Sequence, residues 1–164
     1  MGANVRDWLL GESVRFVREA QQTPGVLRIA LLGSITTAKV APKDIDFLVT
    51  VAEDCDLAVL ALHSRRLKGR LQGNNRTADV FLADSHGRYL GRMCSWRECR
   101  PGKRASCDAR HCGRRPHLHD DIGAVRLAPE LVAAPPLIVW PEVVRHAQLP
   151  ADVEAWVSAV SHAV

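Results

Sequence analysis

Short apolar runs separated by turn residues mark the first half of the chain. Residues 26–32, 47–51 and 77–83 are runs of strand length, and turn-forming Gly, Asn, Asp and Ser residues lie between them. Apolar runs this short, bounded by turn residues, predict buried β-strands. The first half of the chain therefore predicts three strands of one small sheet.

Amphipathic stretches flank these runs and predict helices. The first covers residues 5–22, the second begins after Asp54 or Asp56 as its cap, and the third begins near Pro150. A helix with one apolar stripe buries that stripe against a neighbouring element. The stripes consist of Leu10, Val14 and Val17, of Leu57, Leu60, Ala61, Leu67 and Leu71, and of Val153, Trp156, Val157 and Val160. The expected fold is α/β, of the mixed α+β kind: a small mixed β-sheet flanked by helices.

The second half of the chain carries weaker signals. Residues 88–92 and 124–127 are expected to form short strands, and residues 133–136 to form a linker. Residues 137–140 are a short buried run that Pro141 ends, because proline cannot donate to a sheet ladder. Only the first two of these segments are expected to be strands.

The size of the chain suits one domain. It has 164 residues, 47% of them hydrophobic, so it can bury a core of its own. We expect a core in residues 1–92, a Cys-rich basic segment in residues 93–119 and a strand and helix extension in residues 120–164. No apolar run reaches membrane-spanning length and the N-terminus lacks a signal pattern. The expected location is the cytoplasm, with no membrane partner.

Positive charge is concentrated in one segment. Residues 94–117 hold seven Lys or Arg against two acidic residues, a net +5, so the rest of the chain carries −1 of the total +4. A local excess of this kind favours a polyanionic partner such as RNA.

Two acidic residues and a Gly-Ser pair form the most informative pattern. Gly33 and Ser34 follow the first apolar run, and Asp44 and Asp46 open the second. Alternate residues of a strand project to the same face, so the two carboxylates share one small volume. Such a pair shares a proton or binds a hard divalent cation. A glycine lets the backbone approach a phosphate closely, although a Gly-Ser pair by itself is also typical of an ordinary turn.

The order strand, Gly-Ser, spacer, Asp-Ile-Asp, strand resembles the signature of the polymerase-beta-like nucleotidyltransferase superfamily in its minimal form. The resemblance implies the nucleotidyltransferase fold and a third carboxylate on a neighbouring strand. Asp79 is expected to supply it, with Asp84, a turn residue past the same strand, as the competing assignment.

The resemblance also implies an activity. A nucleoside monophosphate passes from a nucleoside triphosphate to an acceptor hydroxyl, with two Mg²⁺ or Mn²⁺ ions held by Asp44, Asp46 and Asp79. Asp79 would also accept the hydroxyl proton. Gly33 and Ser34 would hold phosphates, and Lys43, or Lys39 in the spacer, would add a charged contact.

The acceptor stays open at this point. RNA bound by the basic segment is the first possibility, and a protein hydroxyl or a small molecule is the second. A third is a non-catalytic nucleotide-binding or nucleic-acid-binding module, for example one half of a toxin–antitoxin pair, and a protein partner fits any of these. The sequence does not identify the nucleotide.

Four of the five cysteines are spaced for a metal. Cys94 and Cys99 form one pair and Cys107 and Cys112 a second pair of equal spacing. Structural zinc favours four such ligands, and an Arg-rich segment with few apolar residues cannot build its own core. A structural Zn²⁺ is therefore expected, with His111, and then His117 or His119, as alternative ligands. Free thiols and disulfides are the other interpretations, and Cys55 is expected to be a small core residue.

Overall fold

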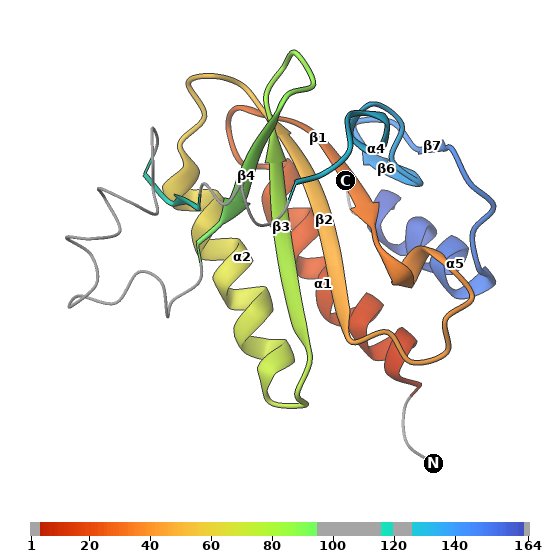
Figure 1. Cartoon of the computed structure of the whole chain (residues 1–164). Helices are drawn as coiled ribbons and strands as arrows, with labels where there is room; N and C mark the ends of the chain where they lie inside the picture. The colour runs from red at the N-terminus through yellow and green to blue at the C-terminus, as the bar shows by residue number, and fades with distance from the viewer. Residues whose placement is uncertain (1–3, 95–115, 120–125, 163–164) are drawn as a thin grey trace.

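The structure, a computed structural model, describes residues 4–94, 116–119 and 126–162. Within these residues the chain forms a mixed α/β fold with one seven-stranded sheet and four α-helices (Figure 1). The helices are α1 (Val5–Gln21), α2 (Leu57–Gln72), α4 (Pro129–Ala133) and α5 (Ala151–Ser161), and a short 3₁₀ turn, η1, covers Ser34–Thr36. The strands are β1 (Val26–Leu32), β2 (Asp44–Val51), β3 (Thr77–Ala83), β4 (Tyr89–Met93), β5 (Leu118–His119), β6 (Leu137–Trp140) and β7 (Val144–Arg145).

The strand order in the sheet is β5-β4-β3-β2-β1-β6-β7. Neighbouring strands run antiparallel except β2 and β3, which run parallel. A parallel pair needs a crossover connection, and α2 supplies it. The sheet is therefore mixed, as the sequence predicts, with β2 at its centre.

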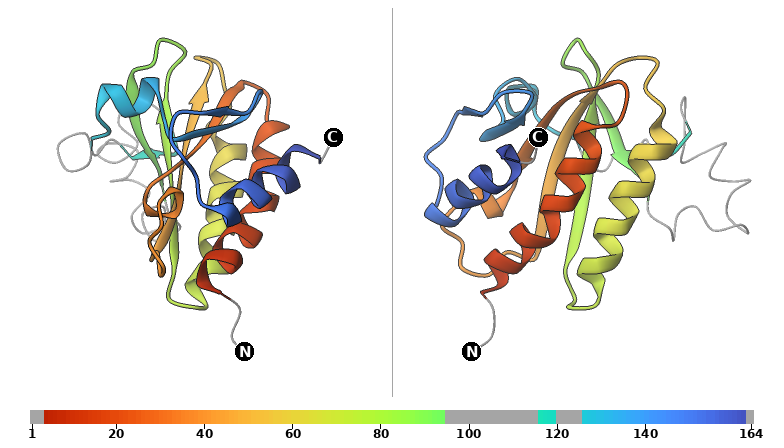
Figure 2. Two further views of the ribbon diagram at one scale, coloured as in Figure 1. Left: turned by 90° about the vertical axis from the view of Figure 1, so that its right-hand side faces the viewer. Right: turned by 180° about the vertical axis from the view of Figure 1, so that it is seen from behind.

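Helices α1, α2 and α5 cover one face of the sheet, and the short helix α4 lies on the other (Figure 2). Successive side chains of β2 point to opposite faces of the sheet, and they contact different helices on the two faces. Ile45, Phe47 and Val49 belong to the large core cluster on the helix-covered face, whereas Leu48 belongs to a smaller cluster with Val132 of α4. We call the side that carries Leu48 the open face.

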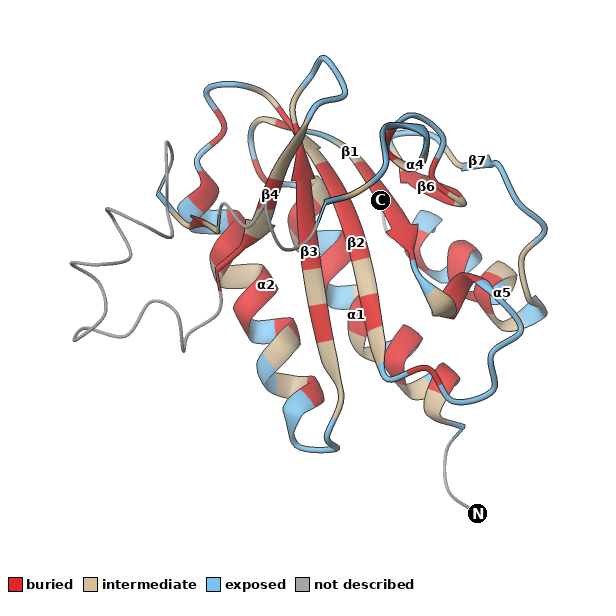
Figure 3. Ribbon diagram, viewed as in Figure 1, coloured by how far each residue is buried: buried red, intermediate tan, exposed pale blue. Residues whose placement is uncertain are grey.

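The main core joins all three long helices to the centre of the sheet. The ring of Phe47 lies 5.0 Å from that of Phe16 on α1 and 6.3 Å from that of Trp156 on α5. Figure 3 shows the buried residues along the central strands and on the inner sides of these helices. Asp56, rather than Asp54, caps α2, because its side chain accepts a hydrogen bond from the Ala58 N–H at 2.9 Å.

The predicted strand at residues 124–127 is wrong for the part of it that the structure describes. Arg126 and Leu127 lie outside any strand, and Leu127 packs against the smaller core cluster, which accounts for its apolar character. Three short elements were missed: α4, which opens with Pro129 in its first turn, and the two-residue strands β5 and β7. Elements this short carry too little periodicity to be detected from sequence.

None of the helices in the described ranges combines the length and hydrophobicity that a membrane span requires. The division of the chain into three segments stays a prediction, because most of the Cys-rich segment lies outside those ranges.

Candidate functional site

Gly33 ends β1 in a conformation that favours glycine. Its φ is 78° and its ψ is −166°, so an L side chain would be strained there. A Cβ added at this position would also lie 2.9 Å from the Oδ2 atom of Asp46. The backbone of Gly33 therefore approaches an Asp46 carboxylate that a larger residue would displace. Gly33 itself is exposed to solvent, so a ligand can reach it.

The turn after Gly33 is held by its own hydroxyl groups. Thr36 donates both its N–H and its Oγ1 hydroxyl to the Gly33 carbonyl, at 3.1 and 2.7 Å. Thr37 does the same to the Ser34 carbonyl, at 3.1 and 2.7 Å. The first amides of a helical turn have no acceptor inside the turn, so those of Ser34 and Ile35 suit an anion.

Three carboxylates share the open face of the sheet. Asp46 on β2 and Asp79 on β3 are direct Cα partners in the parallel pairing, and Asp44 lies two residues before Asp46. The intervening residues Ile45 and Ala78 belong to the core on the opposite face. Because alternate residues of a strand face the same side, Asp44, Asp46 and Asp79 all project from the open face. The structure brings together the three acidic residues that the sequence singled out.

Asp46 carries the strongest electrostatic perturbation. Its burial, then the nearby charges of Asp44 and Asp79, raise the pKa of Asp46 to about 7, against the opposing effects of a backbone hydrogen bond from Asp79 and the charge of Lys68. The Oδ1 atom of Asp46 is buried and has no hydrogen-bond partner among the described residues. A buried acceptor without a partner is costly, and a cation or proton at this atom would satisfy it.

Lys68 belongs to this cluster, although the sequence analysis did not assign it to a site. Its Nζ lies 3.6 Å from the Oδ1 atom of Asp79, and both side chains are largely shielded from solvent. A signal for it exists: Lys68 follows the buried Ser64 by four residues and precedes the buried Leu71 by three, so it borders the buried stripe of α2. A lysine on such a stripe can reach past the helix to the sheet.

The donor set suits a hard cation, because carboxylate oxygens are the ligands that Mg²⁺ prefers. As the side chains are arranged, however, no group of three or more Asp, Glu, His or Cys residues among the described ones is placed to hold a metal. The Asp79 carboxylate pairs with Lys68 instead. A metal held by all three aspartates would require the Asp79 side chain to turn away from that ammonium.

The other predicted phosphate contacts lie on the same loop, between β1 and β2. Ser34 is half-buried, and Lys39 and Lys43 are exposed. The backbone carbonyl of Lys43 accepts a hydrogen bond from the Thr77 N–H at 3.4 Å, which joins the loop to the start of β3. Asp84 lies past the far end of β3 and caps a turn, accepting from the backbone N–H groups of His86 and Arg88. The Asp84 carboxylate is thus engaged in that turn, whereas Asp79 lies beside Asp46.

The predicted zinc ligands fall mostly outside the described residues. Cys94 lies buried just past β4, and its N–H donates to the His117 carbonyl at 3.0 Å. His119 lies on β5, opposite Arg92 of β4. Cys99, Cys107, Cys112 and His111 are outside the described ranges, so the zinc site stays a prediction. Cys55 is buried in the core, as the sequence predicts.

No protein-family model, curated protein or solved structure matches this chain.

Proposed function

We propose that this chain is a metal-dependent nucleotidyltransferase with the minimal polymerase-beta-like fold. The observation that supports the proposal most strongly is that the Gly-Ser turn and the acidic residues, which are separate along the chain, lie next to each other in the fold. The glycine turn at Gly33 approaches the carboxylate of Asp46, and Asp46 lies in register with Asp79. A phosphate held at the turn would thus lie beside the acidic cluster.

The three aspartates would hold the catalytic cations. Asp44, Asp46 and Asp79 supply only oxygen donors, and the orphaned Oδ1 atom of Asp46 fits a ligand role. Bound Mg²⁺ or Mn²⁺ neutralises the triphosphate and lowers the pKa of the attacking hydroxyl. Without a cation, the raised pKa of Asp46 keeps part of this cluster protonated near neutral pH.

The loop residues would bind the triphosphate. The amides after Gly33 and the hydroxyl of Ser34 are placed at the accessible turn, and the ammonium of Lys43 is exposed next to Asp44. In the proposed reaction the acceptor oxygen forms a bond to the α-phosphorus, the bond from that phosphorus to the β-phosphate oxygen breaks, and pyrophosphate leaves. The carboxylate of Asp79 would take the hydroxyl proton, and Lys68 would stabilise that carboxylate's charge in the resting state.

The acceptor class is the open part of the proposal. RNA is favoured by the basic segment, whose net charge is +5 between residues 94 and 117. A protein hydroxyl or a small molecule would need no such segment. A non-catalytic nucleotide-binding module would keep nucleotide affinity without transfer.

The test is transfer of label from each of the four α-labelled nucleoside triphosphates, with Mg²⁺ or Mn²⁺, onto total RNA and onto cell protein. Asp44→Asn/Asp46→Asn is the inactive control, and Asp54→Asn, which changes an exposed carboxylate in the turn before α2, is the matched active control. Label on RNA that only the double variant abolishes supports the RNA acceptor, and label on protein supports the second acceptor class. If no sample carries label but the protein binds nucleotide saturably, the result would contradict a transferase and support a non-catalytic binding module.

A further inference from the structure

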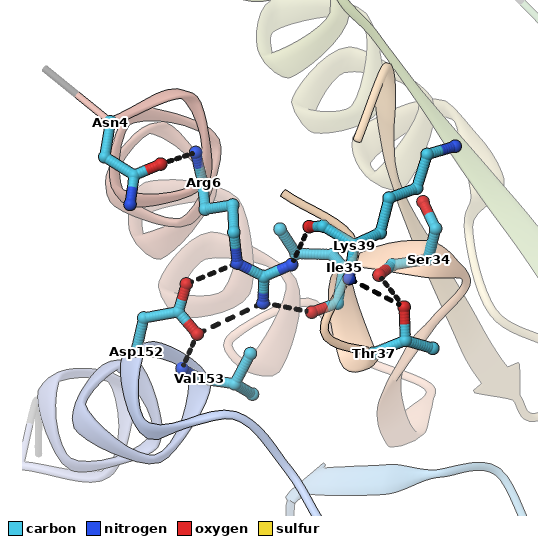
Figure 4. A network of polar contacts seen from close by, with 8 residues as sticks. All are labelled: Asn4, Arg6, Ser34, Ile35, Thr37, Lys39, Asp152 and Val153. Carbon is cyan, nitrogen blue, oxygen red and sulfur yellow. Dashed lines mark hydrogen bonds and ion pairs between the residues drawn. The ribbon is translucent and has the colours of Figure 1, made fainter. Parts of the chain in front are cut away.

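One buried arginine joins the loop between β1 and β2 to two helices (Figure 4). Arg6, in the first turn of α1, is 6% exposed. Its Nε and Nη2 donate to the two carboxylate oxygens of Asp152 in the first turn of α5, at 2.6 and 3.1 Å. Its Nη1 donates to the Lys39 carbonyl at 2.7 Å, and its Nη2 also donates to the Ile35 carbonyl at 2.8 Å. One guanidinium thus holds α1, α5 and two points of the loop.

Besides Arg6, this part of the loop is anchored by the Ile35 side chain, which is fully buried in the main core, and by Thr36, which donates to the Gly33 carbonyl. Lys39 donates its N–H to the Thr37 hydroxyl at 3.3 Å, and that hydroxyl bonds back to Ser34. Both contacts are local and exposed, and residues 37–41 are all exposed. The contact from Arg6 to Ile35 is buried and that to Lys39 is partly buried, and they reach the loop from a residue 29 positions away from Ile35 and 33 from Lys39. The Ile35 side chain fastens the start of the loop to the core, and Arg6 fixes the Ile35 and Lys39 carbonyls.

Arginine suits this place because of its shape. The guanidinium carries several N–H donors in a fixed plane, so it can bind a carboxylate with one edge and carbonyl oxygens with the others. A lysine has the charge but lacks that fork. Asp152 neutralises the buried cation and sets the plane of the guanidinium, and the N–H of Val153 also donates to the Oδ1 atom of Asp152, at 2.9 Å. The pair is a rigid unit behind the loop.

We infer that Arg6 is a positioning residue that holds residues 35–39 in the conformation that receives the triphosphate, with Asp152 orienting its guanidinium. The inference rests on the proposed function. The Ile35 peptide that Arg6 holds follows directly on Gly33 and Ser34, the proposed phosphate ligands. Arg6 lies behind the loop and acts on the nucleotide only through it.

A purely structural role is the competing explanation, in which the pair simply fastens α1 to α5. The double substitution Arg6→Met/Asp152→Leu separates the two. Replacing a buried ion pair by apolar side chains of similar size is often neutral for stability, so the two helices stay packed. The Ile35 and Lys39 carbonyls nevertheless lose their donors. The matched control is Glu12→Leu/Arg70→Met, which removes the ion pair between α1 and α2, at 3.1 Å. Within the described residues, the hydrogen bonds of this pair join only these two helices.

Two measurements decide between these roles. The first is KM and kcat for the nucleotide, which we expect to show an increase in KM of about tenfold or more in the Arg6→Met/Asp152→Leu variant, with a smaller change in kcat. Arg6→Lys should recover part of the loss. The second is amide hydrogen exchange of residues 34–40 without nucleotide, which should become faster in that variant while α1 and α5 keep their protection. The Glu12→Leu/Arg70→Met variant should match the wild type in both measurements.

Failure of the positioning role and failure of the proposed function would give different results. If the wild type neither binds nor transfers a nucleotide, the proposed function fails, and the exchange of residues 34–40 alone decides whether Arg6 holds the loop. If the wild type is active and the Arg6→Met/Asp152→Leu variant keeps its KM and its loop protection, the positioning role is overturned. An equal loss of protection across α1, α5 and the loop would also overturn it, because that result describes a structural clamp.

Discussion

Asp46 on β2 and Asp79 on β3 are direct partners in the parallel strand pairing, and the ammonium of Lys68 lies 3.6 Å from the Asp79 carboxylate. This arrangement places two acidic side chains on one face of the sheet, and the ammonium forms an ion pair with only one of them. Asp46, next to the glycine turn, is left with a raised pKa and an unsatisfied oxygen.

Asp46→Asn should stabilise the metal-free protein at alkaline pH. Burial, Asp44 and Asp79 raise the pKa of Asp46 to about 7, whereas an aspartate in an unfolded chain titrates near 4. Between these pH values the folded state binds more protons than the unfolded state, so stability falls as pH rises through this window. Asparagine has no charge to bury, so the gain should reach at most about 4 kcal/mol near pH 8 and vanish near pH 4.

Urea unfolding at the two pH values measures this effect. Asp54→Asn is the control, because Asp54 is exposed and outside the cluster. A gain for Asp46→Asn that is the same at both pH values would contradict the buried, raised-pKa carboxylate.

Gly33→Ala should destabilise the fold and weaken nucleotide binding. The change strains a backbone with a φ of 78° and pushes a methyl group to 2.9 Å from the Asp46 Oδ2 atom. Gly87→Ala is a close control, because Gly87 has the same φ of 78° but nothing within 4 Å of an added Cβ. Both changes strain a backbone with positive φ. At Gly33, whose ψ of −166° lies in a region essentially restricted to glycine, the strain costs about 1–3 kcal/mol, and only Gly33→Ala adds the contact with Asp46.

Thermal unfolding and titration with a nucleoside triphosphate compare the two glycine variants. We expect the Gly87→Ala variant to bind nucleotide like the wild type. Equal stability and equal nucleotide affinity for both variants would mean that the turn and the carboxylate do not act as one site.

Lys68→Met should tighten divalent cation binding to the apo protein by about tenfold, because the ammonium competes with a cation for Asp79 and repels it. Calorimetric titration with Mn²⁺ measures the affinity directly. Arg66→Met changes an exposed cation on the same helix and should have little effect. An unchanged or weaker affinity for Lys68→Met would show that Asp79 is not a metal ligand.

Cys99→Ser or Cys107→Ser should lower the zinc content and stability of the protein and leave the carboxylate site intact. Elemental analysis of the purified protein and its Mn²⁺ affinity report the two properties separately. Ser106→Ala, next to Cys107, is the control for a change in the same segment. An unchanged zinc content in both cysteine variants would contradict the predicted structural zinc site.

The sequence predicts those parts of the candidate site that depend on local periodicity. Strand alternation puts Asp44 and Asp46 on one face, and the apolar runs locate the strands that carry them. The placement of Asp79 beside Asp46 came from the family resemblance, since periodicity alone does not determine which strands pair. Asp56 as the cap of α2 follows from its hydrogen bond to Ala58, a choice between two aspartates that the sequence left open.

Contacts between residues far apart in the sequence could not be predicted. Arg6 and Asp152 are 146 positions apart, and each is an ordinary charged residue near the start of an amphipathic helix. Their pairing depends on how α1 and α5 meet, which no local pattern encodes. Lys68 belongs to no sequence pattern that marks a site, because the direction of a long side chain depends on the neighbouring strand edge. The two-residue strands β5 and β7 exist only through their partners in the sheet.

The measurement that tests the account most directly compares α-labelled and γ-labelled nucleoside triphosphates with the wild type and the Asp46→Asn variant. Nucleotidyl transfer predicts that the wild type incorporates the α label into the acceptor, releases the γ label as pyrophosphate, and does neither when Asp46 is asparagine. Incorporation of the γ label would indicate phosphoryl transfer instead. Equal α incorporation by the two proteins would contradict a reaction that depends on the Asp46 carboxylate.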